Sequence, residues 1–466
     1  MKQDAPEVKA AAAQIPAMAA AAAAANVSFG VALGGWTLGP YDNRTLFDSL
    51  APQGWPMASL DGYLGTAPPE AEFGALSPAR PRWAFPWAED DNDLTAVQLW
   101  VGRNLAHAAA ASSLGITGHG SLQWRTRTVS PALTAVASYP WNTTLTPGDF
   151  LGAYAAAAFG GGAAGSALGA LLIALDSAGM PRPVHCDPGC MAPSTSFCGA
   201  GGEAPYAFVD AWLAQRGAVA AGGDPAALER FDYWGAHFFQ LRAMARAQCG
   251  WGTYAAALRA VEAAPAGSPQ QRGLAVSLGF PAFAAMVSNF SQLVWALQGA
   301  TATYGDLGVL FQLYGDVDGA AGGGALAVLE GLAGGARCGA PCALPLSYAP
   351  TAGAPAPYLR AFTTRTILER GEPFNVRVHA VGGAGCERAG TACTAFVRAA
   401  GGGAFAGAPL AQEGAGRAVF YAPVPLPPGV ELAGLEWYAS CACEGGGEPL
   451  LFPPGAPAQP ATVVFF

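Results

Sequence analysis

Three carboxylates stand side by side at Glu89, Asp90 and Asp91, one residue after the aromatic segment 83–87, which reads Trp-Ala-Phe-Pro-Trp. Adjacent carboxylates repel one another, and in a partly desolvated cleft this repulsion raises the pKa of at least one of them. A carboxyl group that keeps its proton near neutral pH can act as a general acid. The alternative interpretation is a solvated acidic loop, whose charge suits the N-terminus of a helix expected from Thr95. The aromatic neighbours favour the functional interpretation, because sugar rings stack on aromatic faces beside catalytic carboxylates.

Two other segments carry groups that bind sugar hydroxyls. The stretch 35–44 contains an indole, a carboxylate and an amide, and the stretch 121–127 contains an indole and two guanidinium groups. We expect the following residues to bind substrate: Trp36, Asp42, Asn43, Trp87, Trp124, Arg125 and Arg127. An equally weighted alternative for Arg125 and Arg127 is a structural ion pair with Glu89 or Asp91. His119 is expected to precede a strand, which makes it a poor candidate for a base.

The first 147 residues alternate between short apolar runs and one amphipathic stretch. The runs at 28–33, 57–60, 83–87 and 121–124 predict strands, and the spacing of apolar residues in 95–113 predicts a helix. Strands interleaved with helices indicate parallel βα units. Four units are half of a (β/α)8 TIM-type barrel, in which active-site residues follow the carboxyl ends of the strands. The sequence therefore predicts an α/β fold that begins in mid-barrel.

Two further regions follow this partial barrel. Long non-alternating apolar patterns predict a helical domain over 148–340, and short alternating runs with Gly and Pro turns predict a small C-terminal β-sandwich over 355–466. The domain boundaries expected from the sequence are thus 1–147, 148–340 and 355–466.

The composition narrows the classes of partner. A net charge of −9 and the absence of basic runs argue against a nucleic acid, which is bound by clustered Lys and Arg. We find no Gly-x-Ser-x-Gly, Walker or His-Glu-x-x-His motif, and we expect neither cofactor nor metal. The stretches 18–36 and 152–175 are almost uncharged, but polar and Gly-rich breaks favour soluble helices over a membrane span. An oligosaccharide or polysaccharide remains the expected partner.

Ten cysteines and four Asn-x-Ser/Thr sequons indicate the secretory pathway and disulfide bonds. The sequons begin at Asn26, Asn43, Asn142 and Asn289. No signal peptide opens the sequence, and we expect it to precede Met1. The alternative interpretation of some cysteines is a zinc site, with the ligand set His185, Cys186, Cys190 and Cys198.

Several strings resemble (β/α)8 glycoside hydrolases of the β-hexosaminidase-like and α-glucuronidase-like kind. They are Gly-Trp-Thr-Leu-Gly-Pro, Trp-Ala-Phe-Pro-Trp-Ala-Glu-Asp-Asp, Leu-Trp-Val-Gly-Arg and Gln-Trp-Arg-Thr-Arg, all within 34–127. The resemblance implies hydrolysis of a glycosidic bond by two carboxyl groups, or by one carboxyl group that assists a substrate acetamido group. It implies Glu89 as the acid, with Asp90 or Asp91 orienting it. An isoleucine-histidine pair precedes Trp-Arg-Thr-Arg in similar chains, whereas Leu122 and Gln123 stand here. A non-catalytic extracellular glycan-binding protein is the alternative function.

Overall fold

The chain forms two compact units in a computed structural model. The first unit comprises 1–94, 98–154 and 169–180, and the second comprises 95–97, 155–168 and 181–466. The structure describes the following residues: 6–26, 48–52, 54–59, 76–89, 96–123, 127–181, 185–186, 190–343, 357–363, 367–381, 385–386, 388–414, 418–445 and 447–465.

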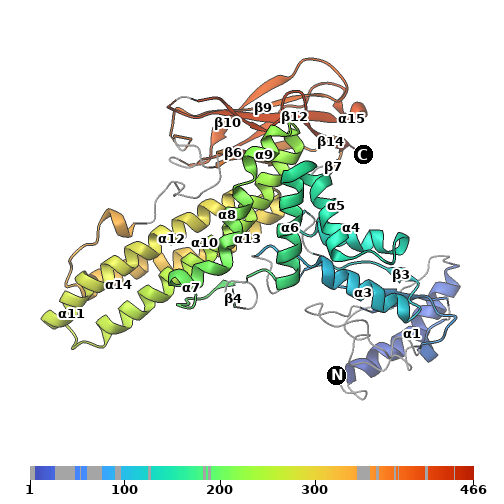
Figure 1. Cartoon of the computed structure of the whole chain (residues 1–466), viewed down its shortest axis with the longest axis horizontal. Helices are drawn as coiled ribbons and strands as arrows, with labels where there is room; N and C mark the ends of the chain where they lie inside the picture. The colour runs from blue at the N-terminus through green and yellow to red at the C-terminus, as the bar shows by residue number, and fades with distance from the viewer. Residues whose placement is uncertain are drawn as a thin grey trace. The chain divides into compact units, whose positions relative to one another are not determined.

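A small parallel sheet forms the centre of the first unit. Strands β1 (Met57–Ser59), β2 (Arg82–Ala84) and β3 (Gly118–His119) lie in that order, with Met57 opposite Arg82 and Trp83 opposite Gly118. Helices α1 (Pro6–Ala24), α3 (Val101–Ser113) and α4 (Ser130–Ser138) belong to the same unit (Figure 1), and the 3-10 turn η4 (Tyr139–Trp141) follows α4. Helices α5 (Pro147–Phe159) and α6 (Gly162–Ala178) each contain residues of both units.

Arg80 anchors the segment that enters β2. Its guanidinium group is buried, forms an ion pair with Asp48, and donates to the carbonyl oxygens of Ala51, Pro52 and Trp55 at 2.8–2.9 Å. A carbonyl group that is buried without a donor destabilises a fold, so one arginine here satisfies several acceptors at once. This network ties the segment that precedes β1 to the residue pair that precedes β2.

Asp176 of α6 positions the N-terminus of α3. Its carboxylate accepts the backbone N–H groups of Val101 and Gly102, each at 2.8 Å, which are among the first N–H groups of α3 and lack helical partners. Burial raises the pKa of Asp176, while these two hydrogen bonds act in the opposite direction. A Cβ atom at position 102 would lie 2.8 Å from the carboxylate, so the close approach needs glycine there.

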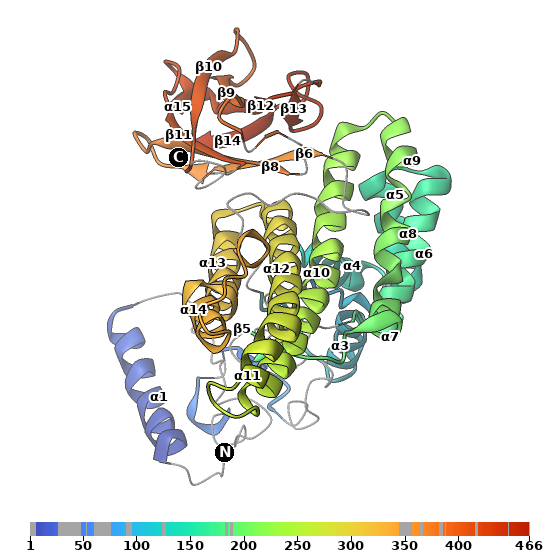
Figure 2. The ribbon, with the colours of Figure 1, turned by 90° about the vertical axis from the view of Figure 1, so that its left-hand side faces the viewer.

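The second unit contains a helical region built around two long helices. Helix α10 (Pro225–Glu262) and helix α12 (Phe280–Ala300) lie side by side, as Figure 2 shows. Aromatic rings meet between them, with centroid distances of 5.3 Å for Phe239 and Trp295 and 5.0 Å for Tyr254 and Phe283. The remaining elements are β4 (His185–Cys186), β5 (Cys190–Met191), α7 (Gly199–Glu203), η5 (Ala204–Tyr206), α8 (Ala207–Leu213), α9 (Arg216–Ala221), α11 (Pro269–Leu274), the π-helical turn η6 (Ala275–Gly279), α13 (Tyr304–Ala321), α14 (Gly323–Leu332) and η7 (Ala340–Cys342).

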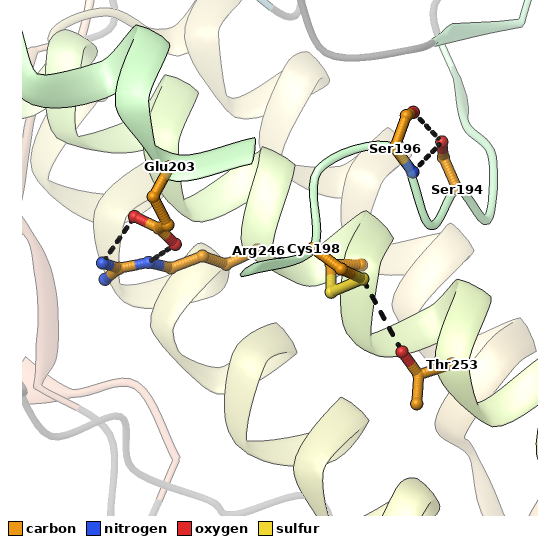
Figure 3. The surroundings of a disulfide bond; sticks show 7 residues. Ser194, Ser196, Cys198, Glu203, Arg246 and Thr253 are labelled. Carbon is orange, nitrogen blue, oxygen red and sulfur yellow. Dashed lines mark hydrogen bonds and ion pairs between the residues drawn. A yellow bond between two sulfur atoms is a disulfide. The ribbon is translucent and has the colours of Figure 1, made fainter. Parts of the chain in front are cut away.

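A disulfide joins the segment before α7 to α10. Cys198 bonds to Cys249, and the adjacent ion pair of Glu203 with Arg246 holds the same two elements together at 2.6 Å (Figure 3). Because Cys198 is bonded to Cys249, the alternative zinc site loses one of its four ligands. Cys338 and Cys342 form a second bridge.

Among the residues that the structure describes, one helical stretch, Pro269–Ala300, is long and apolar enough to cross a membrane. Length and composition are weak evidence, because the core helix of a soluble protein passes the same test. Phe283 and Phe290 of this stretch are fully buried and contact rings of α10. The expectation that the chain has no membrane span stays a prediction.

The C-terminal region is a curled sheet of nine strands. Its order is β6-β8-β11-β10-β9-β12-β14-β7, with β13 paired to β12. The strands are β6 (Tyr358–Thr363), β7 (Ile367–Leu368), β8 (Phe374–Val381), β9 (Ala392–Ala399), β10 (Ala406–Gln412), β11 (Val419–Val424), β12 (Leu435–Ala442), β13 (Leu450–Phe452) and β14 (Ala461–Phe465), with the short helix α15 (Val430–Ala433) before β12.

The core of this region combines apolar side chains with two disulfides. Phe374 of β8 and Trp437 of β12 meet with ring centroids 5.8 Å apart inside one buried cluster. Cys393 and Cys441 lie opposite each other in the β9–β12 register and are bonded, and Cys386 bonds to Cys443. The bridges therefore join β9 and its preceding loop to β12 and the residue after it.

The coarse order expected from the sequence is the order observed: α/β units first, then helices, then a strand-rich C-terminal region. The expected strand at 28–33 lies outside the described residues. The strand expected at 121–124 instead begins earlier, at Gly118, and continues only as a single bridge between Trp87 and Leu122. The boundaries 1–147, 148–340 and 355–466 stay predictions, as does the barrel.

Candidate functional site

Glu89 follows the carboxyl end of β2 along the chain. Trp87 forms a parallel bridge with Leu122, and the chain turns at Ala88 and Glu89 directly after it. The backbone N–H of Ala88 donates to the carbonyl oxygen of Leu122 at 2.9 Å, which fixes the start of this turn. The side chain of Glu89 is fully buried, with 0% of its surface exposed.

Two aromatic rings lie on one face of β2. Trp83 and Phe85 are half-buried and meet edge to face, with centroids 6.3 Å apart. Gly118 and Gly120 lie beneath them on the neighbouring strand, where an added Cβ atom would come within 2.3 Å of a ring atom. Any larger residue at either position would clash with the Trp83 or Phe85 ring, so the close approach of these rings requires glycine at both positions. This segment therefore carries two half-buried aromatic rings, followed along the chain by the buried carboxyl group of Glu89.

A histidine pair lies at β3 and α3. The rings of His119 and His107 stack in parallel, 5.7 Å apart and 2° from coplanar. Burial lowers the pKa of His107 to about 3, with further lowering from His119 and Arg103, and burial lowers the pKa of His119 to about 4. Both rings are therefore neutral at physiological pH. Both ring nitrogens of His107, and Nε2 of His119, find no hydrogen-bond partner within the described part of the chain.

Most of the other expected site residues lie outside the described part of the chain. These are Asp90, Asp91, Trp36, Asp42, Asn43, Trp124 and Arg125. Trp87 is described and is 1% exposed, so its ring presents almost no surface in this conformation. Arg127 is half-buried in the turn before α4, where its carbonyl oxygen accepts the N–H of Ser130. The structure thus places Glu89, Trp87 and Arg127 and leaves their assembly into one site a prediction.

A second cluster of aromatic residues covers the outer side of strands β9 and β12. Phe396 and Tyr438 lie opposite each other and stack, with centroids 4.5 Å apart and planes 7° apart, and Phe405 meets Tyr438 edge to face. Arg398 lies over the Phe405 ring at 4.2 Å and pairs with Glu436 at 2.7 Å. We call this half-exposed group the β9–β12 aromatic cluster.

Two features of this region have signals in the sequence that the predictions did not use: rings packed over glycines, and polar side chains on the buried face of α3. Trp83 and Phe85 alternate with Ala84, and Gly118 and Gly120 alternate with His119, which is the pattern of rings packed over glycines on adjacent strands. Asn104 and His107 are three residues apart and therefore lie on the same face of α3, so the spacing indicates two polar side chains on the buried face of this helix.

Neither a family model nor a curated protein matches the chain.

The disulfides provide the firmest information on its surroundings. Four cysteine pairs are bonded in the described part of the chain. Such bonds form and persist in an oxidising environment, which is extracellular or belongs to the secretory pathway.

Proposed function

We propose that the chain acts in a secreted glycoside hydrolase and forms part of its (β/α)8 barrel. The observation that carries this proposal is the carboxyl group of Glu89 at the end of a parallel strand that also presents Trp83 and Phe85. The flat rings suit the apolar face of a pyranose. The carboxyl group suits protonation of the glycosidic oxygen, after which the bond to the anomeric carbon breaks. The proposed class is the one suggested by the strings within 34–127, which resemble β-hexosaminidase-like and α-glucuronidase-like enzymes.

In this proposal the residues have separate roles. Glu89 donates the proton, and Asp90 or Asp91 orients it. Trp36, Trp124, Arg125 and Arg127 bind the sugar hydroxyls, with Asp42, Asn43 and Trp87. A second carboxylate, or the acetamido group of the substrate, stabilises the positive charge that develops at the anomeric carbon. The substrate is an oligosaccharide or polysaccharide.

Replacing Glu89 by Gln tests the role of the acid. Turnover of aryl glycosides with poor leaving groups is expected to fall by about 100-fold, because a general acid contributes on that scale. Turnover of dinitrophenyl glycosides is expected to fall far less, because dinitrophenolate departs without protonation. The measurement is kcat for both substrate types with the parent chain and the variant.

Glu448→Gln serves as a matched control, because Glu448 is an exposed carboxylate of the C-terminal region. It is expected to leave both rates unchanged. An equal loss with both leaving groups for Glu89→Gln would indicate a structural role for Glu89, and unchanged rates would remove it from the mechanism.

The second candidate function is binding of glycans without hydrolysis, and the β9–β12 aromatic cluster favours it. Replacing Tyr438 by Ala removes a ring that stacks on Phe396 and meets Phe405 edge to face. We expect at least a tenfold loss of affinity on a glycan array, by analogy with nucleic-acid bases, for which each stacking ring contributes about 1–3 kcal/mol to binding. Tyr421→Ala is the control, because Tyr421 is a half-buried tyrosine of β11, outside this cluster. Unchanged binding by Tyr438→Ala would exclude the cluster as the binding surface.

A further inference from the structure

Trp141 is the most exposed large apolar side chain in the described part of the chain. It ends the 3-10 turn η4, and 92% of its surface is accessible to water. Single exposed apolar residues are common on protein surfaces, but an indole is the largest of them. The residue that follows it is Asn142, the first residue of a sequon.

The sequon forms a turn in which the asparagine side chain is held in place. The N–H of Leu145 donates to the carbonyl oxygen of Asn142 at 3.1 Å, which closes a four-residue turn. The side-chain Oδ1 of Asn142 accepts both the N–H of Thr144 at 3.2 Å and its hydroxyl at 2.8 Å. Residues 141–144 are all exposed. Nδ2 of Asn142 therefore faces solvent and donates to no group in the described part of the chain.

We propose that Asn142 is an N-glycosylation site and that the first sugar of the attached glycan covers Trp141. The donor is an oligosaccharide on a lipid pyrophosphate. Nδ2 attacks the anomeric carbon of the first sugar, the bond from that carbon to the pyrophosphate oxygen breaks, and Nδ2 loses one proton, which passes to solvent. The lipid pyrophosphate leaves with the electron pair. The apolar face of the linked pyranose then stacks on the indole, which removes that face from water.

The local character of this turn matters for the proposal. Each hydrogen bond that shapes it joins residues two to four positions apart, so the turn can form before the rest of the chain folds. Transfer to a nascent chain in the secretory pathway needs this independence. The four disulfides place the chain in the same oxidising compartment.

The sequon at Asn289 provides the contrast. Asn289 lies in the middle of α12, and its Nδ2 would be 2.7 Å from a Cβ atom at Gly250 of α10. The hydroxyl of Ser291 donates to the backbone carbonyl of Val287 instead of to Asn289. A glycan at this position would separate α10 from α12. Asn26 is exposed, but Ser28 and the whole Asn43 sequon lie outside the described residues.

Translation of the full chain behind a secretory signal in the presence of microsomes tests the acceptor site. The substitutions Asn26→Gln, Asn43→Gln and Asn289→Gln leave Asn142 as the remaining sequon. This variant is expected to gain the mass of one oligosaccharide, and treatment with a glycosidase is expected to remove that mass. Thr144→Ser is expected to retain this gain and Thr144→Ala to lose it, whereas the control Thr143→Ala retains it. The absence of any gain in the chain with only the Asn142 sequon would overturn the proposal.

Oxidation of tryptophan tests the contact with Trp141. N-bromosuccinimide is expected to oxidise Trp141 more slowly, by at least threefold, in the glycosylated protein than after an amidase has removed the whole glycan. Trp251, which is half-buried in α10, is the internal reference and is expected to react equally in both samples. Equal rates at Trp141 would show that the glycan does not cover the indole.

Discussion

Acidification from pH 6.5 to pH 4 is expected to destabilise the first unit by several kcal/mol, through His107 and His119. Both rings remain neutral in the folded chain, where their pKa values are about 3 and about 4. In the unfolded chain each ring takes up a proton near pH 6.5. The folded pKa values are lowered, so the stabilising contribution is present above pH 6.5 and is lost as the pH falls toward 4.

The size of this effect follows from proton uptake on unfolding. Each ring that is protonated only in the unfolded state lowers the free energy of unfolding by at most about 1.4 kcal/mol per pH unit. Two rings in the same unit therefore give a slope of up to about 3 kcal/mol per pH unit. Domains are stable by about 5–15 kcal/mol, so this loss is large enough to unfold the unit.

The whole chain is unfolded in urea at pH 5, 6 and 7. Hydrogen exchange in the peptides that cover α3 and β3 gives the urea midpoint of the first unit at each pH. His107→Phe is expected to halve the slope, because it removes one titrating ring and keeps an aromatic ring against His119. His379→Phe is the matched control, since burial also lowers the pKa of His379 to about 4, but in the second unit. A slope in α3 and β3 that is unchanged by His107→Phe would contradict this account.

The sequence contained enough information for the order of elements but not for the extent of the strands. The runs at 57–60 and 83–87 predicted β1 and β2, because apolar residues bounded by turns are a strong local signal. The third strand was placed three residues late. Its first residues, Gly118 and His119, have low strand propensity, and they pair because glycine admits the Trp83 ring across the sheet.

The candidate site was predictable only in part. The position of Glu89 after a parallel strand followed from the chain order, but its complete burial did not, since burial depends on segments far away in the sequence. The stacking of His107 on His119 likewise joins a helix to a strand, and no local pattern reports it.

In the C-terminal region, β10 was not predicted because Gly407, Pro409 and three alanines give it little strand character.

Replacing Arg360 by Ala is expected to destabilise the second unit by about 3–5 kcal/mol. Arg360 of β6 is 1% exposed, forms an ion pair with Glu229 of α10 at 2.7 Å, and donates to the carbonyl oxygen of Gly299 at 3.0 Å. Gly299 is in the last turn of α12, where carbonyl groups lack helical partners. One guanidinium group therefore ties the C-terminal sheet to both long helices. The measurement is the urea midpoint for unfolding of the whole chain, detected by hydrogen exchange in the peptides that cover β6 and α10.

Most of this cost is expected to come from the carboxylate that the substitution leaves behind. Only 14% of the Glu229 side-chain surface is exposed, so without Arg360 its charge stays poorly hydrated. The double variant Arg360→Met with Glu229→Leu is therefore expected to be more stable than Arg360→Ala, because both charges are gone. Arg388→Ala, which breaks the exposed pair with Glu444 at 3.9 Å, is expected to change stability by less than about 1 kcal/mol. A double variant as unstable as Arg360→Ala would instead assign the cost to the lost hydrogen bond at Gly299 and to packing around the guanidinium group.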